Sequence, residues 1–157
     1  MEYGEAIETR IRIENEYRSG ASWFYWIAGM SILNEIFIQT HTSWNFAIGL
    51  GITQICSAIF GSNVVSIVIN LIISGIFLLF GKMAHRGHRW AFIVGMILYS
   101  FDGILFILVK DYVGLGLHVF ALFYIYRGMK AYKQLITISN SQTLTASEEE
   151  EAFSNKI

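Results

Sequence analysis

Several apolar stretches, each long enough to cross a lipid bilayer as a helix, follow one another between residues 21 and 131. An α-helix rises about 1.5 Å per residue, so about 20 residues cross roughly 30 Å of hydrocarbon. Hydrophobic residues make up 54% of the chain, which is more than a globular core of 157 residues would hide. The sequence therefore predicts an all-α integral membrane protein. The predicted spans are Ala21 to Gln39, Ser62 to Lys82, Arg89 to Val109 and Tyr112 to Ala131.

A further apolar stretch, Trp44 to Phe60, is shorter and more polar than these four. Lys and Arg concentrate on the cytoplasmic side of membrane proteins, so their distribution decides whether this stretch crosses. If it does not cross, Lys110 alone falls on the outer side, and one side receives Arg10, Arg12, Arg18, Lys82, Arg86, Arg89, Arg127, Lys130 and Lys133. If it crosses, that asymmetry disappears. The sequence thus predicts a four-helix transmembrane bundle, both termini in the cytoplasm, and a re-entrant or interfacial helix on the outer side, with five transmembrane helices as the alternative.

The two ends of the chain are polar and are predicted to lie in the cytoplasm. Residues 1–20 carry five glutamates and three arginines, with apolar residues near helical spacing, which suits a polar helical segment. The transmembrane bundle is expected over residues 21–131. Residues 132–157 are predicted to be a largely disordered acidic tail, because Ser139 to Ile157 is rich in Ser, Thr, Asn and Glu and lacks a periodic apolar face.

Two carboxylates, Glu35 and Asp102, lie inside the apolar stretches, where an ionised group is costly unless it is paired. In the four-span topology both fall in the outer half of the bilayer, at a similar depth to His118 and Asn70. Small and polar residues form stripes on the same helix faces, and such stripes allow close helix packing in lipid. The candidate intramembrane polar cluster consists of Glu35, Asp102, His118, Asn34, Asn70 and Gln54.

Three interpretations of this cluster remain open. The first is a satisfied polar core in which Asp102 and His118 form a hydrogen-bonded pair across the hairpin at Lys110 and Asp111. The second is a proton or ion path, because carboxylate and imidazole groups at membrane depth are typical of relays. The third is a metal site with Glu35, His41, Asp102 and His118 as ligands. The sequence favours the first, because no HExxH motif and no closely spaced pair of histidines lies on a predicted span.

No enzymatic motif supports a catalytic function. The glycines at residues 49–53 lack the GxGxxG spacing of a phosphate-binding loop, and the single cysteine, Cys56, excludes an intramolecular disulfide. No nucleic-acid-binding surface and no cofactor is indicated. We expect a non-enzymatic structural or regulatory protein that contacts the lipid bilayer and associates with itself or with other membrane proteins. A small transporter or ion-handling protein that uses Glu35, Asp102 and His118 is the alternative.

Three segments carry a resemblance to known sequences: WIAGMSILNEI at 26–36, WNFAIGLGITQI at 44–55, and the long stretch from RWAFIVGM to YIYRGMKA at 89–131. They resemble a family of small, uncharacterised bacterial integral membrane proteins that cross the membrane several times. The resemblance implies a location in the bacterial plasma (inner) membrane. It implies no activity, substrate or catalytic residue.

Overall fold

The structure, a computed structural model, describes residues 2–40, 50–60 and 64–154. Within these ranges all regular secondary structure is helical, so the predicted all-α fold is confirmed. The helices are α1 (Glu2–Gln39), α2 (Gly51–Phe60), α3 (Val64–His85), α4 (Arg89–Leu108) and α5 (Tyr112–Ser154).

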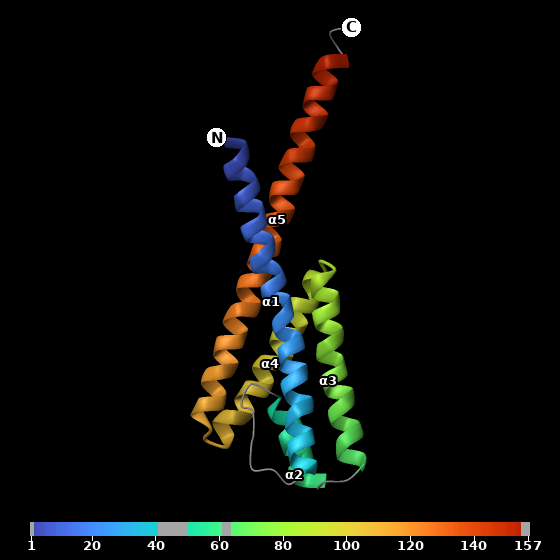
Figure 1. Cartoon of the computed structure of the whole chain (residues 1–157), viewed down its shortest axis with the longest axis vertical. Helices are drawn as coiled ribbons and strands as arrows, with labels where there is room; N and C mark the ends of the chain where they lie inside the picture. Colours follow the sequence, from blue (N-terminus) through green and yellow to red (C-terminus); the bar gives the residue numbers. More distant parts are fainter. Residues whose placement is uncertain (1, 41–49, 61–63, 155–157) are drawn as a thin grey trace.

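The four long helices run alternately in opposite directions, as Figure 1 shows. The start of α1, the α3–α4 turn and the end of α5 lie toward one end of the bundle, and α5 extends furthest. The end of α1, α2, the start of α3 and the α4–α5 turn lie at the opposite end. Both turns are tight: Gly87 has φ +83° in the first, and Lys110 has φ +59° in the second. α1 packs against α3 and α5, and α4 packs against α5.

α2 is much shorter than the other helices. Its ten residues span about 15 Å, roughly half the thickness of a bilayer core, and it lies beside the bundle at the end where α1 stops and α3 begins (Figure 1). That the stretch Trp44 to Phe60 does not cross the membrane stays a prediction. Residues 44–49, the first part of that predicted segment, lie outside the described residues.

α3 and α4 are each long and apolar enough to cross a membrane. Only 33% and 39% of their apolar windows are buried inside the bundle, so most of these residues face outward. The predicted spans in α1 and α5 are also long enough, but polar side chains interrupt them: Asn34 and Glu35 in α1, His118 and Arg127 in α5. Among residues 2–40, 50–60 and 64–154, two helices are therefore candidate spans by length and composition.

A hydrogen bond joins α1 to α3 near the α3–α4 turn. The buried hydroxyl of Tyr17 donates to the carbonyl of Ala84 at 2.6 Å, and the Tyr17 ring lies 5.0 Å from the Tyr132 ring. Burial raises the pKa of the Tyr17 hydroxyl, so it keeps its proton and remains a donor at neutral pH.

The C-terminal segment differs from its prediction, because α5 continues as a helix to Ser154 instead of becoming irregular after residue 138. All of its described side chains from residue 139 to residue 148 are exposed, which agrees with the missing apolar face. Hydroxyl groups within the segment donate to carbonyls of the preceding turn, as Thr143 does to Ser139 and Thr145 to Ser141. These hydroxyl groups therefore find hydrogen-bond acceptors within their own helix.

Candidate functional site

The carboxylate of Asp102, on α4, caps the first turn of α2. Its Oδ2 accepts the backbone N–H of Gly51 at 2.7 Å, and its Oδ1 accepts the backbone N–H of Ile52 at 2.8 Å. The first N–H groups of a helix have no acceptor within the helix, and the positive end of the helix dipole favours a negative charge. Asp102 is only 6% exposed, so this cap lies inside the bundle.

α1 holds the same end of α2 from the other side. The hydroxyl of Ser31 donates to the carbonyl of Ile27 at 2.8 Å and accepts the backbone N–H of Leu50 at 2.8 Å. The hydroxyl of Thr53 donates to the carbonyl of Leu50 at 2.6 Å. Three consecutive backbone N–H groups at the start of α2 therefore bond to side chains of α1 and α4.

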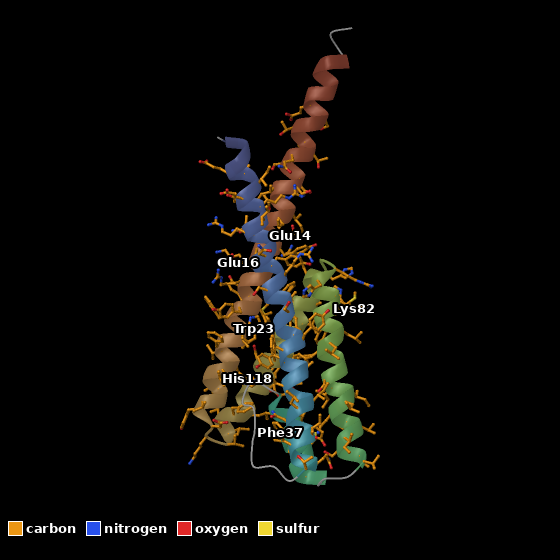
Figure 2. The ribbon with its side chains drawn as sticks, in the orientation of Figure 1. Glu14, Glu16, Trp23, Phe37, Lys82 and His118 are labelled. Carbon is orange, nitrogen blue, oxygen red and sulfur yellow. The ribbon has the colours of Figure 1, made fainter. Side chains whose placement is uncertain are left out.

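His118, on α5, completes the hydrogen bonds of Asp102. Its Nε2 lies 3.0 Å from Asp102 Oδ2, and its Nδ1 lies 2.9 Å from the carbonyl of Gly114. The imidazole and the backbone N–H groups of Gly51 and Ile52 therefore all contact the one carboxylate. Figure 2 shows His118 closer to the α2 end of the bundle than Trp23 or Lys82.

Aromatic rings of α4 enclose the imidazole. The ring of Tyr99 stacks on His118 with centroids 4.2 Å apart, and the ring of Phe106 lies 4.5 Å away. Gly51 leaves the space that Phe106 occupies, because a Cβ at this position would lie 2.7 Å from a Phe106 ring atom. The glycine thus lets the α2 backbone approach Asp102.

A second polar group lies between α1 and α3. Glu35 Oε1 accepts the side-chain amide of Gln39 at 2.7 Å, and Glu35 Oε2 accepts the side-chain amide of Asn70. Glu35 follows Ser31 by one helical turn, so α1 connects the two polar groups. Asn34, the other α1 residue of the predicted polar cluster, directly precedes Glu35 in the sequence and is fully buried.

The predicted hydrogen bond between Asp102 and His118 is confirmed, and Glu35 is paired with Asn70. Gln54 belongs to α2, but its side chain lies outside the described residues, as does the whole of His41. Where side chains are described, no three His, Cys, Asp or Glu residues gather as a metal site would need. The metal hypothesis therefore gains no support from this part of the chain.

The capping of α2 by Asp102 and Ser31 is the functional feature that sequence reasoning missed. Every residue except proline has a backbone N–H group, so the sequence could not indicate that those of Gly51 and Ile52 are the hydrogen-bond partners of Asp102. One signal was available: Leu50 precedes α2, and its side chain has no atom that can accept a hydrogen bond from the first turn. A helix without a cap of its own needs an acceptor from another element.

In comparisons with known proteins, no family model, no curated protein and no solved structure matches this chain. The resemblance to small bacterial membrane proteins therefore stays a prediction.

Proposed function

We propose that the chain is a multi-pass integral membrane protein of the plasma membrane, and that it is a non-enzymatic structural or regulatory component. In this proposal α1, α3, α4 and α5 cross the bilayer, both termini lie in the cytoplasm, and α2 is a re-entrant helix on the outer side. One observation carries the proposal: in the half of the bundle that contains α2 many of the buried side chains are polar, whereas large apolar side chains of α3 and α4 are exposed on the outside.

α3 illustrates this inverted distribution best. In its first half α3 buries Ser66, Asn70 and Ser74, whereas Leu71 and Ile72 are 52% and 59% exposed. Its second half buries Phe77 and Phe80. A water-soluble protein gains stability by burying large apolar side chains, so it would place these two sets the other way round. In lipid, small residues allow close helix packing, and polar residues bond across the interface. The exposed apolar face of α3 therefore suits a hydrocarbon environment.

The distribution of charge supports an orientation. Lys82, Arg86 and Arg89 flank the α3–α4 turn, which lies toward the end from which the polar parts of α1 and α5 extend (Figure 1). Lys110 belongs to the turn at the opposite end. An excess of Lys and Arg marks the cytoplasmic side. We therefore assign the end with the α3–α4 turn to the cytoplasm.

The hydrogen bonds of Asp102 support a structural role for the buried charges. A helix that begins inside a bilayer exposes N–H groups where no water can accept them, and such backbone is tolerated only when protein covers it. Asp102 and Ser31 provide these acceptors for α2. His118 gives the carboxylate a further hydrogen-bond partner, and a carboxylate without partners at this depth would be costly. In this account the cluster anchors a re-entrant helix and performs no chemistry.

Single introduced cysteines test the membrane topology. After Cys56 is replaced by Ser, Glu5→Cys and Arg86→Cys are expected to react with a membrane-impermeant maleimide only when the cytoplasmic face is accessible. Tyr112→Cys is expected to react from the outside. All three native side chains are exposed, so labelling depends on sidedness. Extraction with alkaline carbonate should leave each variant in the membrane. Labelling of residues 5 and 86 from opposite sides would mean that the α2 segment crosses, and it would overturn the re-entrant assignment.

A second candidate function is proton or cation handling by the Asp102–His118 pair. The observation that favours it is a cavity of about 390 Å³ next to Asp102, whose other lining residues are apolar, including Ile52, Phe77 and Leu98.

Proton flux into liposomes decides between the two functions. We expect the wild-type chain to conduct no more than empty liposomes, and His118→Gln to change nothing. Flux in the wild type that is abolished by His118→Gln or Asp102→Asn would replace the structural role with a relay.

A further inference from the structure

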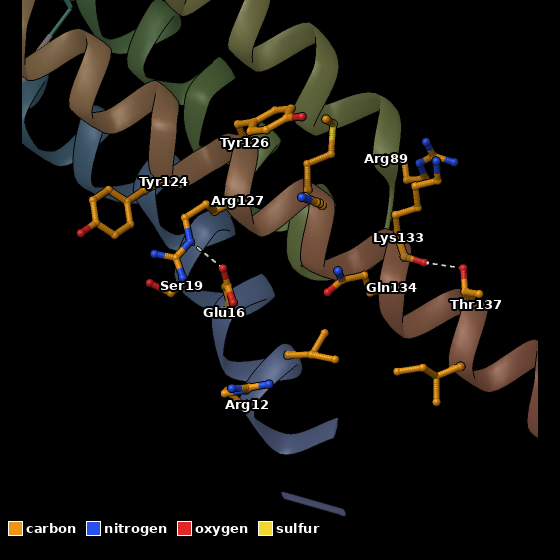
Figure 3. A pocket seen from close by; sticks show the side chains of 14 residues that line it. Arg12, Glu16, Ser19, Arg89, Tyr124, Tyr126, Arg127, Lys133, Gln134 and Thr137 are labelled. Atoms are coloured by element: carbon orange, nitrogen blue, oxygen red, sulfur yellow. Dashed lines mark hydrogen bonds and ion pairs between the residues drawn. The ribbon is translucent and has the colours of Figure 1, made fainter. Parts of the chain in front are cut away.

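A large groove with basic walls runs along α5, away from the buried polar cluster. Figure 3 shows it, with α1 on one side of α5 and the start of α4 on the other. Its volume is about 1050 Å³, and its lining contains five cationic side chains and one carboxylate, Glu16. The cationic residues are Arg12 of α1, Arg89 of α4, and Arg127, Lys130 and Lys133 of α5.

Most of this positive charge is available to a ligand. Glu16 bonds to Arg127, with Glu16 Oε1 2.6 Å from Arg127 Nε, and it thereby neutralises one cation. Lys130 and Lys133 are exposed in the described structure. Five cations held around one carboxylate repel one another, so an anion that binds between them relieves this repulsion. Phosphate oxygens accept hydrogen bonds from guanidinium and ammonium groups alike.

The position of the groove along the bundle axis indicates which part of a membrane it would face. Tyr124 lines the groove and stacks on Trp23, with centroids 5.5 Å apart, and Tyr126, which also lines it, is 53% exposed. Tyr and Trp concentrate where a membrane protein meets the headgroup layer. Under the proposed topology the groove therefore opens at the level of the inner-leaflet phosphates.

We propose that this groove is a binding site for the phosphate of an anionic phospholipid headgroup. Lys130 and Lys133 contact the phosphate, and Arg12 and Arg89 approach it from the flanking helices. Tyr126 remains at the boundary between headgroup and acyl chain. This inference rests on the proposed membrane insertion, because a lipid headgroup reaches the groove only if the helices are embedded.

Native mass spectrometry of the full chain, released from micelles that contain equal amounts of phosphatidylglycerol and phosphatidylcholine, tests the site. The wild type is expected to retain phosphatidylglycerol in preference to phosphatidylcholine. The double variant Lys130→Gln/Lys133→Gln should lower this preference about tenfold, since both side chains contact the phosphate in the proposed site and each charge-assisted hydrogen bond contributes severalfold to its binding. The control is Lys82→Gln/Arg86→Gln, which removes the same charge at the same end of the bundle but outside the groove. It should change the preference less than threefold.

Other outcomes overturn the proposal in distinguishable ways. An equal loss in both double variants would mean that general surface charge, and no particular site, attracts the lipid. Displacement of the lipid by millimolar glycerol 3-phosphate or inorganic phosphate would assign the groove to a soluble phosphate compound instead of a lipid. A chain that stays in carbonate-washed membranes but shows no preference would refute the lipid site alone. A chain that carbonate releases would refute the proposed function as well.

Discussion

Replacing Asp102 by Asn is expected to release α2 from the bundle and to lower the free energy of unfolding by about 3 kcal/mol. The carboxylate oxygens accept from Gly51 and Ile52, and Oδ2 also pairs with His118. An amide has one acceptor oxygen, so one of the two N–H groups loses its acceptor whichever way the amide is turned. The loss occurs in a buried site, where a donor without a partner carries its full desolvation cost.

The single cysteine provides a local measurement of this release. Cys56 lies on α2 and is half-buried, so its reaction rate with a thiol reagent in mild detergent reports how tightly α2 is held. Asp102→Asn should accelerate labelling of Cys56 under conditions in which the rest of the bundle stays folded. Thermal denaturation of the same sample gives the loss of overall stability.

Asp111→Asn is the matched control for this substitution. Asp111 caps the start of α5, where its Oδ1 accepts the backbone N–H of Gly114 at 3.0 Å. Asn caps a helix about as well as Asp, and Asp111 is less buried than Asp102, so both the stability and the labelling rate should stay near wild type. If Asp102→Asn and Asp111→Asn behave alike, Asp102 does not anchor α2.

The sequence was sufficient for the long-range plan of this fold because its strongest signals are compositional. The apolar stretches give the bounds of α3 and α4 to within a few residues, whereas α1 and α5 continue as helices into polar sequence. The excess of Lys and Arg on one side argued against a crossing by the segment before Gly61. The pairing of Asp102 with His118 was also predictable. Both lie on faces that the short α4–α5 turn brings together, and each would be costly without the other.

The finer structure of the site depended on information that a single sequence does not carry. Asp102 bonds mainly to backbone atoms of α2, and a backbone donor looks the same at every residue except proline. Glu35 was placed in the same cluster as Asp102 and His118 by depth and helix face, and it bonds to Asn70 of that cluster and to Gln39, which the prediction did not include. Depth along a helix can be counted from the sequence, but the rotation that selects a neighbour depends on the packing of all the helices.

Gly128→Val is expected to have a second large effect, because Gly128 of α5 lies against Gly20 of α1. A Cβ at Gly128 would lie 2.6 Å from the Cα of Gly20, so the two backbones would have to move apart. Backbone atoms cannot rotate out of the way as a flexible side chain can, and we expect a loss of about 3 kcal/mol in the free energy of unfolding. Unfolding in a series of SDS and mild-detergent mixtures measures this loss.

Gly116→Val provides the control within the same helix, because nothing lies within 4 Å of a Cβ built at Gly116. Its effect should be limited to the small difference in helix propensity between Gly and Val. Gly20→Val should reproduce the loss of Gly128→Val, because it enters the same contact from the other helix. The double variant Gly20→Val/Gly128→Val should lose less unfolding free energy than the two single variants lose together. The first Val already moves the two helices apart, which leaves room for the second. Equal stability of Gly128→Val and Gly116→Val would show that α1 and α5 do not pack through these glycines.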